Sequence, residues 1–242
     1  MHAMFTFIDE LNDFLPHARK NTSFSLDFEP HQSLKHLIES LGVPHTEFGR
    51  VLVNGQLAES TSRLQTGDQV TVHPADFPLP GGSCFILDNH LGQLATYLRM
   101  LGFDSLYRND YQDDELSRVA SLEGRVLLTR DRRLLMRKAV TLGYCLHHTD
   151  PRQQVVELLR RFELFGQVKP FQRCLRCNSP LQVVGKEEII ERLEPLTKKY
   201  YDEFRLCPAC NQIYWKGSHY GHMLEMIAEM EHAGTPSQGD GS

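Results

Sequence analysis

Hydrophobic and polar residues alternate in short runs along the first third of the chain, as they do in half-buried β-strands. Four runs show this pattern, at residues 5–8, 24–28, 51–53 and 70–72. Between the second and third runs, four apolar residues recur at helical spacing: Leu34, Leu37, Ile38 and Leu41. Two strands, a helix and further strands follow the order of a small β-grasp fold, which we therefore expect for residues 1–78.

Strand and helix patterns alternate four times in the middle of the chain. The expected strands lie at residues 84–87, 103–107, 125–129 and 144–149. A helix is expected after each strand, and glycines at positions 102, 124 and 143 should end the first three. Asp150 before Pro151 is an N-cap followed by proline, which starts the fourth. Repeated strand–helix units predict a three-layer α/β domain over residues 84–168, with a parallel sheet between helices.

Prolines and glycines interrupt the hydrophobic pattern at residues 74–82, which indicates a linker at 79–83. A second boundary is expected near residues 166–170, so that residues 169–222 form a third, smaller segment. The end of the chain is rich in glycine and polar residues, and we expect a flexible tail at 223–242.

The composition is that of a folded protein, with 40% hydrophobic and 24% charged residues. The longest unbroken apolar run has four residues, far short of the roughly 18 needed to span a membrane. No secretory signal is visible at the N-terminus, so the expected compartment is the cytoplasm. The net charge of −5 is distributed unevenly, because residues 83–168 carry 12 basic and 11 acidic side chains and residues 169–222 carry 9 and 6. A polyanionic partner would therefore meet these two segments.

Acidic residues follow the predicted strands of the middle segment. They are Asp88, Asp131 and Asp150 after the first, third and fourth strands, and Asp113, Asp114 and Glu115 after the second. All strand-to-helix turns of a parallel sheet emerge at one edge, so these carboxylates are expected to converge in one crevice. Magnesium and manganese prefer such oxygen ligands and share them with phosphates. The pattern predicts metal-assisted hydrolysis of a phosphate ester.

Helix capping is the alternative explanation, because aspartate is a favoured N-cap and each of these acids precedes or begins a helix. The run after Asp88 lacks the second aspartate of haloacid-dehalogenase-type phosphatases and the glycine-rich turn of nucleotide-binding folds. A receiver-like signalling domain remains an alternative. Basic residues that would hold substrate phosphates lie nearby in sequence, although a solvated helix face would look the same: Arg130, Arg132, Arg133, Arg137 and Lys138, with Arg99 and Arg108 extending the patch.

Four of the six cysteines form two Cys-x2-Cys pairs, Cys174 with Cys177 and Cys207 with Cys210. Two such pairs are a strong signal for a tetrahedral zinc site, and four thiolates leave no open position for catalysis. We expect a zinc ribbon over residues 169–222, with an inserted helix at 186–204 that is broken at Pro195. The aromatic residues that follow, Tyr214 and Trp215, either stack nucleic-acid bases or form the core of the ribbon.

Several of these motifs together resemble the Mut-seven C-terminal ribonuclease family, a PIN-type nuclease domain with an appended zinc ribbon. The matching runs are Phe85–Asp88, Leu91–Asp104, Asp113–Leu116, Leu127–Arg132, Cys207–Cys210 and Tyr214–His219. Residues 1–78, with the runs Leu11–Pro16 and Gly42–Glu47, look like the ubiquitin-like domain often found before it, and are also similar to ubiquitin-like sulfur carriers. The resemblance covers about residues 4–222.

The resemblance implies a magnesium- or manganese-dependent ribonuclease. It assigns metal positions to Asp88 and Asp131, leaves the next ligand open among Asp113, Asp114 and Glu115, and makes Asp150 a plausible fourth acid. We expect Asp88, Asp114 and Asp131 to hold the ion and the attacking water, Asp150 to assist, and Arg99, Arg130, Arg132 and Arg133 to hold RNA phosphates. Cys174, Cys177, Cys207 and Cys210 would bind structural zinc, and the ubiquitin-like domain would recruit a protein partner. The alternative is a non-catalytic zinc-ribbon RNA-binding or adaptor protein.

Overall fold

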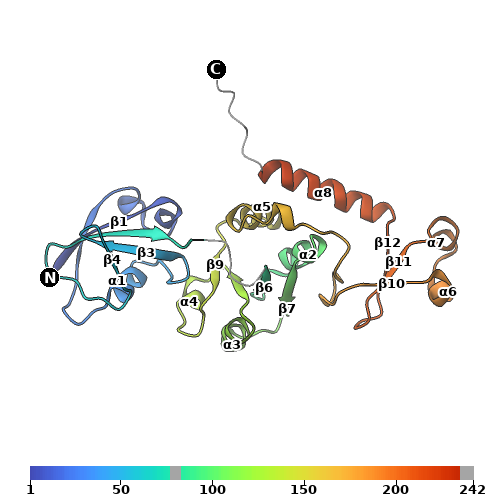
Figure 1. Ribbon diagram of the computed structural model, residues 1–242, viewed down its shortest axis with the longest axis horizontal. Helices are drawn as coiled ribbons and strands as arrows, with labels where there is room; N and C mark the ends of the chain where they lie inside the picture. The colour runs from blue at the N-terminus through green and yellow to red at the C-terminus, as the bar shows by residue number, and fades with distance from the viewer. Residues whose placement is uncertain (77–82, 235–242) are drawn as a thin grey trace, which may run out of the picture. The chain divides into compact units, whose positions relative to one another are not determined.

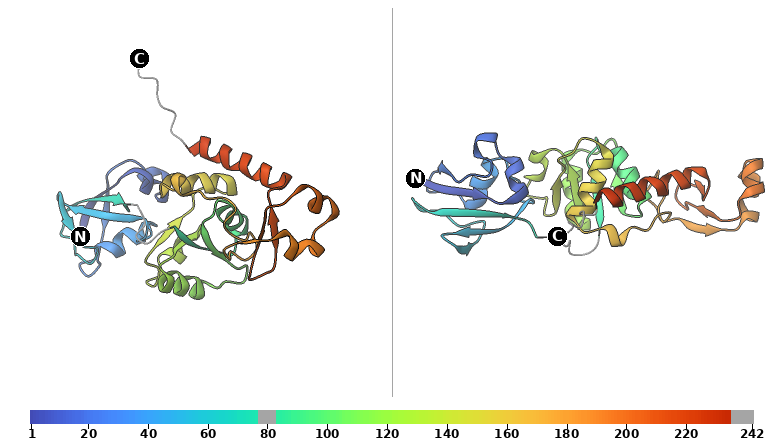
Figure 2. Two further views of the ribbon diagram at one scale, coloured as in Figure 1. Left: turned by 45° about the vertical axis from the view of Figure 1, so that its right-hand side comes forward. Right: turned by 90° about the horizontal axis from the view of Figure 1, so that it is seen from above.

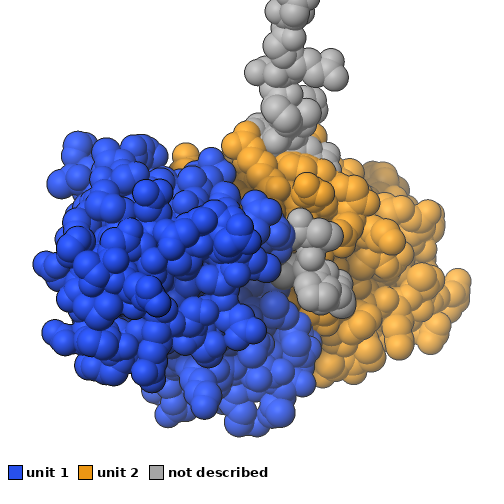
Figure 3. Space-filling view, turned by 60° about the vertical axis from the view of Figure 1, so that its left-hand side comes forward, with its two compact units in different colours: residues 1–78, 112–145 blue, residues 79–111, 146–242 orange. Residues whose placement is uncertain are grey.

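The computed structural model describes residues 1–76 and 83–234, and its contacts divide the chain into two compact units. Unit 1 contains residues 1–78 and 112–145, and unit 2 contains residues 79–111 and 146–242 (Figure 3). The middle of the chain therefore contributes to both units. The linker expected at 79–83 falls almost entirely outside the described residues.

The N-terminal part of unit 1 is the expected β-grasp domain (Figure 1). Its sheet has the order β2-β1-β5-β3-β4, and the central strands β1 and β5 are parallel. Alternate residues of these strands, including Phe5, Val70 and Val72, are almost completely buried beneath the apolar face of α1. The elements are β1 (His2–Phe7), β2 (Phe24–Asp27), α1 (Leu34–Ser40), β3 (Phe48–Val53), β4 (Gln56–Ala58) and β5 (Gln69–Pro74), with short 3-10 helices at Asp9–Phe14 and His17–Arg19.

The second part of unit 1 contains α3 (Asp113–Glu123), β8 (Val126–Thr129), α4 (Arg132–Leu135) and β9 (Gly143–Cys145). Gly124 ends α3 in the left-handed conformation, as predicted. The prediction that Gly143 ends a helix is wrong, because α4 is a single turn and Gly143 begins β9. A Cβ at position 143 would lie 2.6 Å from Cδ2 of Leu135, so this glycine allows the strand to approach α4.

Hydrogen bonds join the β-grasp domain to α4 and β9 within unit 1. Arg132 donates to the carbonyl of Phe14 at 2.8 Å, and its guanidinium lies over the Phe14 ring. His45 Nε2 lies 2.8 Å from the carbonyl oxygen of Val140. Glu47, whose side chain is buried, accepts a hydrogen bond from the backbone N–H of Cys145 at 2.6 Å. The ubiquitin-like region is thus part of a larger packed body.

Unit 2 is built around β6 (Cys84–Leu87), α2 (Gly92–Met100), β7 (Asp104–Tyr107) and α5 (Pro151–Arg161), followed by a 3-10 turn at Phe165–Gln167. Strand β6 pairs with β7 in parallel, with Phe85 opposite Ser105. The Phe85 ring packs against Phe103 and Phe162, each with ring centroids 6.1 Å away. Strands β8 and β9 of unit 1 are also parallel, which confirms the parallel sheet that the alternating pattern predicts.

The third segment folds as an antiparallel sheet of β10 (Gln182–Val184), β11 (Phe204–Leu206) and β12 (Ile213–Trp215), seen in two further views in Figure 2. The predicted helical insertion is present between β10 and β11 and is interrupted before Pro195. It consists of α6 (Lys186–Ile189), a 3-10 turn (Ile190–Arg192) and α7 (Pro195–Tyr200). Ile189 and Leu193 of the insertion pack against Phe204 and Ile213 of the sheet, so the insertion closes a small core of its own.

Helix α8 (Ser218–Gly234) differs from the predicted tail at 223–242. Its Ile227 is buried, and Glu229 lies 3.9 Å from Arg152 of α5. The sequence analysis predicted no helix here, and the helix packs against α5. Residues 235–242 of the predicted tail lie outside the described part of the chain. Within the described residues, no helix is long and apolar enough to cross a membrane.

Candidate functional site

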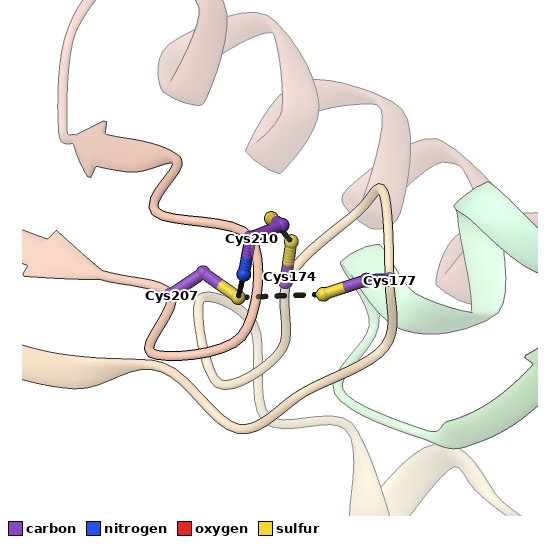
Figure 4. Close-up of side chains that lie close together, drawn as sticks. All are labelled: Cys174, Cys177, Cys207 and Cys210. Atoms are coloured by element: carbon purple, nitrogen blue, oxygen red, sulfur yellow. Dashed lines mark hydrogen bonds between the residues drawn. The ribbon is translucent and has the colours of Figure 1, made fainter.

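The four cysteines of the two Cys-x2-Cys pairs come together in unit 2, as their spacing predicts (Figure 4). Their sulfur atoms all lie within 4.8 Å of one another. Cys174 and Cys207 are completely buried, Cys210 is half-buried and Cys177 is exposed. Among the described residues, this is the one group of three or more His, Cys, Asp or Glu side chains close enough to share a metal ion.

The two cysteine turns, which we call knuckle 1 (residues 174–179) and knuckle 2 (residues 207–212), have the same backbone construction. In each, an asparagine directly after the second cysteine has positive φ, 69° at Asn178 and 62° at Asn211. The N–H of each asparagine donates at 2.9 Å to the carbonyl of the first cysteine. The first cysteine of each knuckle donates at 2.9 Å to the residue five positions later. These bonds direct both sulfur atoms of a knuckle to one point.

The sulfur positions fit zinc better than disulfides. Cys174 and Cys210 have sulfur atoms 3.4 Å apart, and Cys177 and Cys207 have theirs 3.3 Å apart. A disulfide bond needs about 2.05 Å. Four sulfurs about 2.3 Å from a tetrahedral zinc ion are about 3.8 Å apart, close to the observed spacing. Four soft sulfur donors in this arrangement therefore suit zinc, and they occupy every tetrahedral position.

One thiol in knuckle 1 is prepared for ionisation. Burial acts to raise the pKa of Cys174, but hydrogen bonds from the Tyr214 hydroxyl, 3.2 Å from its sulfur, and from backbone amides lower this pKa to about 6. Desolvation of its sulfur inside the cluster, together with the adjoining thiols of Cys207, Cys174 and Cys210, raises the pKa of Cys177 to about 12, although the residue as a whole is exposed. A thiolate is thus available at neutral pH to receive a metal ion, whose charge would then deprotonate the other thiols.

Knuckle 1 is anchored to the core of unit 2 by a buried arginine. Arg99 is only 4% exposed, and its Nη1 donates to the carbonyls of Leu175 and Arg176, the two residues between the cysteines. Its Nε donates to the carbonyl of Ser105. Burial lowers the pKa of Arg99, while the charges of the nearby thiolates raise it. The sequence suggested Arg99 as a phosphate ligand, but its guanidinium is already occupied inside the protein and holds knuckle 1.

Asn178 forms the second anchor of knuckle 1. Its Oδ1 accepts a hydrogen bond from the N–H of Ser105 at 3.0 Å, and its Nδ2 donates to Asp104 at 2.8 Å. Asp104 in turn pairs with Arg173 at 3.1 Å. Sequence reasoning overlooked Asn178 and Asn211, and it named Tyr214 without its hydrogen bond to Cys174. The repeated Cys-x2-Cys-Asn pattern is the signal that would have identified the two asparagines.

In unit 1, three of the predicted acids lie in the first turn of α3. Arg137 pairs with Asp113 at 3.2 Å and also contacts Asp114, whose side chain is 94% exposed. Glu115, next to them, is half-buried. Asp131 is the N-cap of α4, where it accepts a hydrogen bond from the N–H of Arg133 at 2.8 Å. These acids begin the two helices as predicted, and Arg137 already neutralises part of their charge.

In unit 2, Asp88 directly follows the buried strand β6, and Asp150 precedes α5. Asp150 is an N-cap that accepts hydrogen bonds from Arg152 and Gln153, both at 3.0 Å. Asp88 has no such role for α2, because the N-cap of that helix is Leu91. Capping therefore accounts for Asp131 and Asp150 but leaves Asp88 to be explained.

The predicted phosphate-binding arginines have different surroundings. Arg130 and Arg133 are exposed beside the start of α4. The guanidinium of Arg132 instead donates a hydrogen bond to the Phe14 carbonyl and lies over the Phe14 ring. The guanidinium of Arg137 pairs with the acids of α3. Of the four arginines assigned to substrate by the sequence, the structure thus leaves Arg130 and Arg133 exposed and uses Arg99 and Arg132 in internal contacts.

Comparison with known proteins places these features in a family. The Mut7-C RNAse domain matches residues 83–227, which is more than half of the chain, and the Mut7-C ubiquitin domain matches residues 1–79. Two crystal structures of small archaeal modifier protein 1 (SAMP1) from Haloferax volcanii are similar to part of the chain. One has 17% identity over 34% of this chain and 100% of its own, and the other 16% over 31% and 98%; both have a TM-score of 0.26. No curated protein matches the chain. The chain belongs to the Mut7-C RNAse domain family, with a Mut7-C ubiquitin domain in front, and its RNase domain indicates a nuclease-type function.

Proposed function

We propose that the protein is a metal-dependent ribonuclease that hydrolyses RNA phosphodiester bonds. The match of residues 83–227 to the Mut7-C RNAse domain is the observation that carries this proposal. Acidic side chains follow strands or begin helices in units 1 and 2, and carboxylates are the usual ligands of magnesium and manganese. Among the described residues, no three of these acids lie close enough to share an ion, so their role as ligands is proposed from their places in the sequence. In this proposal residues 84–168 are a PIN-like nuclease domain, residues 169–222 a zinc ribbon and the cytoplasm the site of action.

Asp88 and Asp131 would hold the magnesium or manganese ion together with one acid from the first turn of α3, and Asp150 would assist. The bound ion would activate a water molecule and stabilise the leaving oxygen. The sequence favoured Asp114 as this third ligand. Its side chain is far more exposed than that of Glu115, so Asp113 and Glu115 are retained as candidates for the same position. Arg137 would partly neutralise the negative charges of Asp113 and Asp114 while no ion is bound.

Arg130 and Arg133 would position the RNA, because their exposed guanidinium groups lie next to Asp131 in the chain and pair well with phosphate oxygens. Zinc held by the four cysteines would stabilise the fold of residues 169–222 without taking part in hydrolysis. The ubiquitin-like region would bind a protein partner through a surface other than the residues that contact α4 and β9.

A non-catalytic RNA-binding or adaptor protein is the second candidate. The observation that favours it is that Asp131 and Asp150 both cap helices. Asparagine and serine are about as good as aspartate at an N-cap, so Asp131→Asn and Asp131→Ser remove the carboxylate while keeping the cap. These two variants separate catalysis from capping.

The deciding experiment incubates labelled single-stranded RNA with the full chain in manganese, in magnesium and with neither ion. Asp88→Asn, Asp131→Asn and Asp131→Ser should each lose cleavage by more than the roughly 10- to 100-fold typical of residues outside the ligand shell. Their thermal unfolding should remain close to that of the parent. Asp202→Asn is the matched control, because it changes an exposed acid within residues 169–222. RNA binding without metal-dependent cleavage, unchanged in the three variants, would favour the adaptor. Cleavage that survives in all three variants would reject Asp88 and Asp131 as ligands of the catalytic ion.

A further inference from the structure

An aromatic cavity lies beside knuckle 1 within unit 2. Its volume is about 120 Å³, and its walls include Phe171, Tyr214, Trp215 and Tyr220. All four rings are half-buried, so each keeps part of its surface open to solvent. Aromatic side chains on an open cavity wall offer flat apolar faces, and this is the type of surface on which nucleic-acid bases stack.

Phe171 is held in this wall at a conformational cost. Its φ of +65° is in the left-handed region, which is unfavourable for a bulky residue. The edge of its ring meets Tyr220, with ring centroids 5.2 Å apart, and the guanidinium of Arg205 lies over it at 5.2 Å from the centroid. A strained aromatic side chain fixed by two neighbours is typical of a preformed binding surface rather than of a core residue.

Trp215 is fixed just as closely on the same wall. A Cβ at Gly217 would lie 2.7 Å from Nε1 of Trp215, so only a glycine backbone can approach the indole this closely. The cavity is therefore bordered by two aromatic rings from different parts of the chain, Phe171 before β10 and Trp215 at the end of β12.

Positive charge surrounds these rings. Arg173 is part of the cavity wall, Arg205 covers Phe171, and Lys169 and Arg176 are exposed on the adjoining turns. The segment of residues 169–222 carries 9 basic and 6 acidic side chains, a net charge of +3. A ligand that matches this surface is flat, aromatic and anionic, which is the chemistry of a nucleotide.

We propose that this cavity binds one unstacked base of single-stranded RNA, with the base against Phe171 and Trp215 and the adjoining phosphates near Arg205 and Arg176. This inference rests on the proposed function for its substrate, and it makes that substrate single-stranded at the position held by the cavity. The site contacts the base face rather than its edge, so it tolerates different bases.

Trp215 is the single tryptophan of the chain, so intrinsic fluorescence reports directly on the cavity. The probe is a six-nucleotide oligouridylate, compared with the same strand in which all bases are absent, without added magnesium or manganese so that no cleavage occurs. The intact strand should quench Trp215 and bind between about 5-fold and 150-fold more tightly than the abasic strand, the range for stacking one base. Equal binding of both strands, or no change in Trp215 fluorescence, would overturn the proposal.

Two variants and a control test the location of the site. Phe171→Asn removes the ring but keeps a residue that tolerates positive φ, and Arg205→Gln removes the charge. Each should weaken binding of the intact strand about tenfold, and Phe171→Asn should also reduce the preference over the abasic strand by about the same factor. Lys199→Gln changes an exposed cation of α7 outside the cavity and should bind as the parent does. Zinc content and circular dichroism confirm that each variant is folded.

The binding experiment tests the cavity separately from the proposed ribonuclease activity. Base-dependent quenching without metal-dependent cleavage would support the cavity and reject the ribonuclease. Cleavage with unchanged RNA affinity in Phe171→Asn would reject the cavity alone. Quenching by an apolar peptide at lower concentration than by the oligouridylate would identify the cavity as a protein-binding site and would also overturn the proposal.

Discussion

Knuckle 1 and knuckle 2 have the same backbone and entirely different surroundings. Both use a Cys-x2-Cys-Asn sequence with the asparagine at positive φ. Asn178 of knuckle 1 is 5% exposed and bonds to β7, and Arg99 holds the carbonyls of the same turn. Asn211 of knuckle 2 is exposed and contacts Arg192 of the insertion. The difference teaches that local sequence determines the shape of a Cys-x2-Cys turn, whereas the rest of the domain determines how firmly the turn is held.

Removing zinc should unfold both knuckles, so that they no longer differ in how firmly they are held. We expect this to be the largest effect on stability. A zinc chelator, or either of the variants Cys174→Ser and Cys207→Ser, should unfold residues 169–222, because structural zinc sites contribute on the order of 10 kcal/mol to folding. Both serine variants should behave alike, since each deprives the shared ion of one buried ligand. Zinc content and hydrogen exchange of residues 172–217 are the measurements. A segment that stays protected without zinc would contradict a folding role for the ion.

Changing Arg99 should loosen knuckle 1 and leave knuckle 2 in place. Arg99→Met keeps much of the side-chain volume but leaves three backbone carbonyls without their donor, and it should lower the free energy of unfolding by about 3 kcal/mol. Arg99→Lys should recover part of this loss, because an ammonium group cannot reproduce the planar fork of the guanidinium. Chemical denaturation of the zinc-loaded protein measures both. If Arg99→Met unfolds like the parent, the arginine is not an anchor.

The two asparagines allow the comparison at equivalent positions. Glycine also accepts positive φ, so Asn178→Gly and Asn211→Gly keep the turn and remove only the side-chain bonds. Asn178→Gly should cost about 2 kcal/mol, because it leaves the buried N–H of Ser105 without an acceptor, while Asn211→Gly should change stability by less than about 0.5 kcal/mol. Denaturation midpoints with equal slopes would give both values. Equal losses would mean that the environments of the knuckles do not matter.

Sequence patterns identified most elements of the fold because each carries its own local signal. The alternation of apolar residues located β1, β2, β3 and β5 of the β-grasp domain and β6 to β8, but it missed the short strand β4, and Asp150-Pro151 marked the start of α5 correctly. Gly143 was misjudged because a glycine looks the same in a sequence whether it ends a helix or makes room for Leu135. Helix α8 was missed because its packing partner is α5, a contact that the local sequence does not reveal.

In the candidate site too, features set by neighbouring residues could be predicted, whereas contacts between residues far apart in the chain could not. Cysteine spacing was sufficient to predict the sulfur cluster, since each pair is a short turn. The uses of Arg99 and Arg132 were not predictable, because their partners lie 76 and 118 residues away along the chain. The preference for charged residues at protein surfaces favoured phosphate binding for both arginines, and only the fold reveals that they bind backbone carbonyls.

The bond from Cys145 to Glu47 has a consequence for how the protein is made. Its two partners are 98 residues apart in the chain. At a synthesis rate of roughly 5–20 residues per second, Glu47 leaves the ribosome about 5–20 s before its partner does. During that interval the nascent ubiquitin-like region must keep the later contact surface of Glu47, His45 and Phe14 hydrated or shielded by a chaperone. Unit 1 can therefore complete its packing only after residues 112–145 have been synthesised.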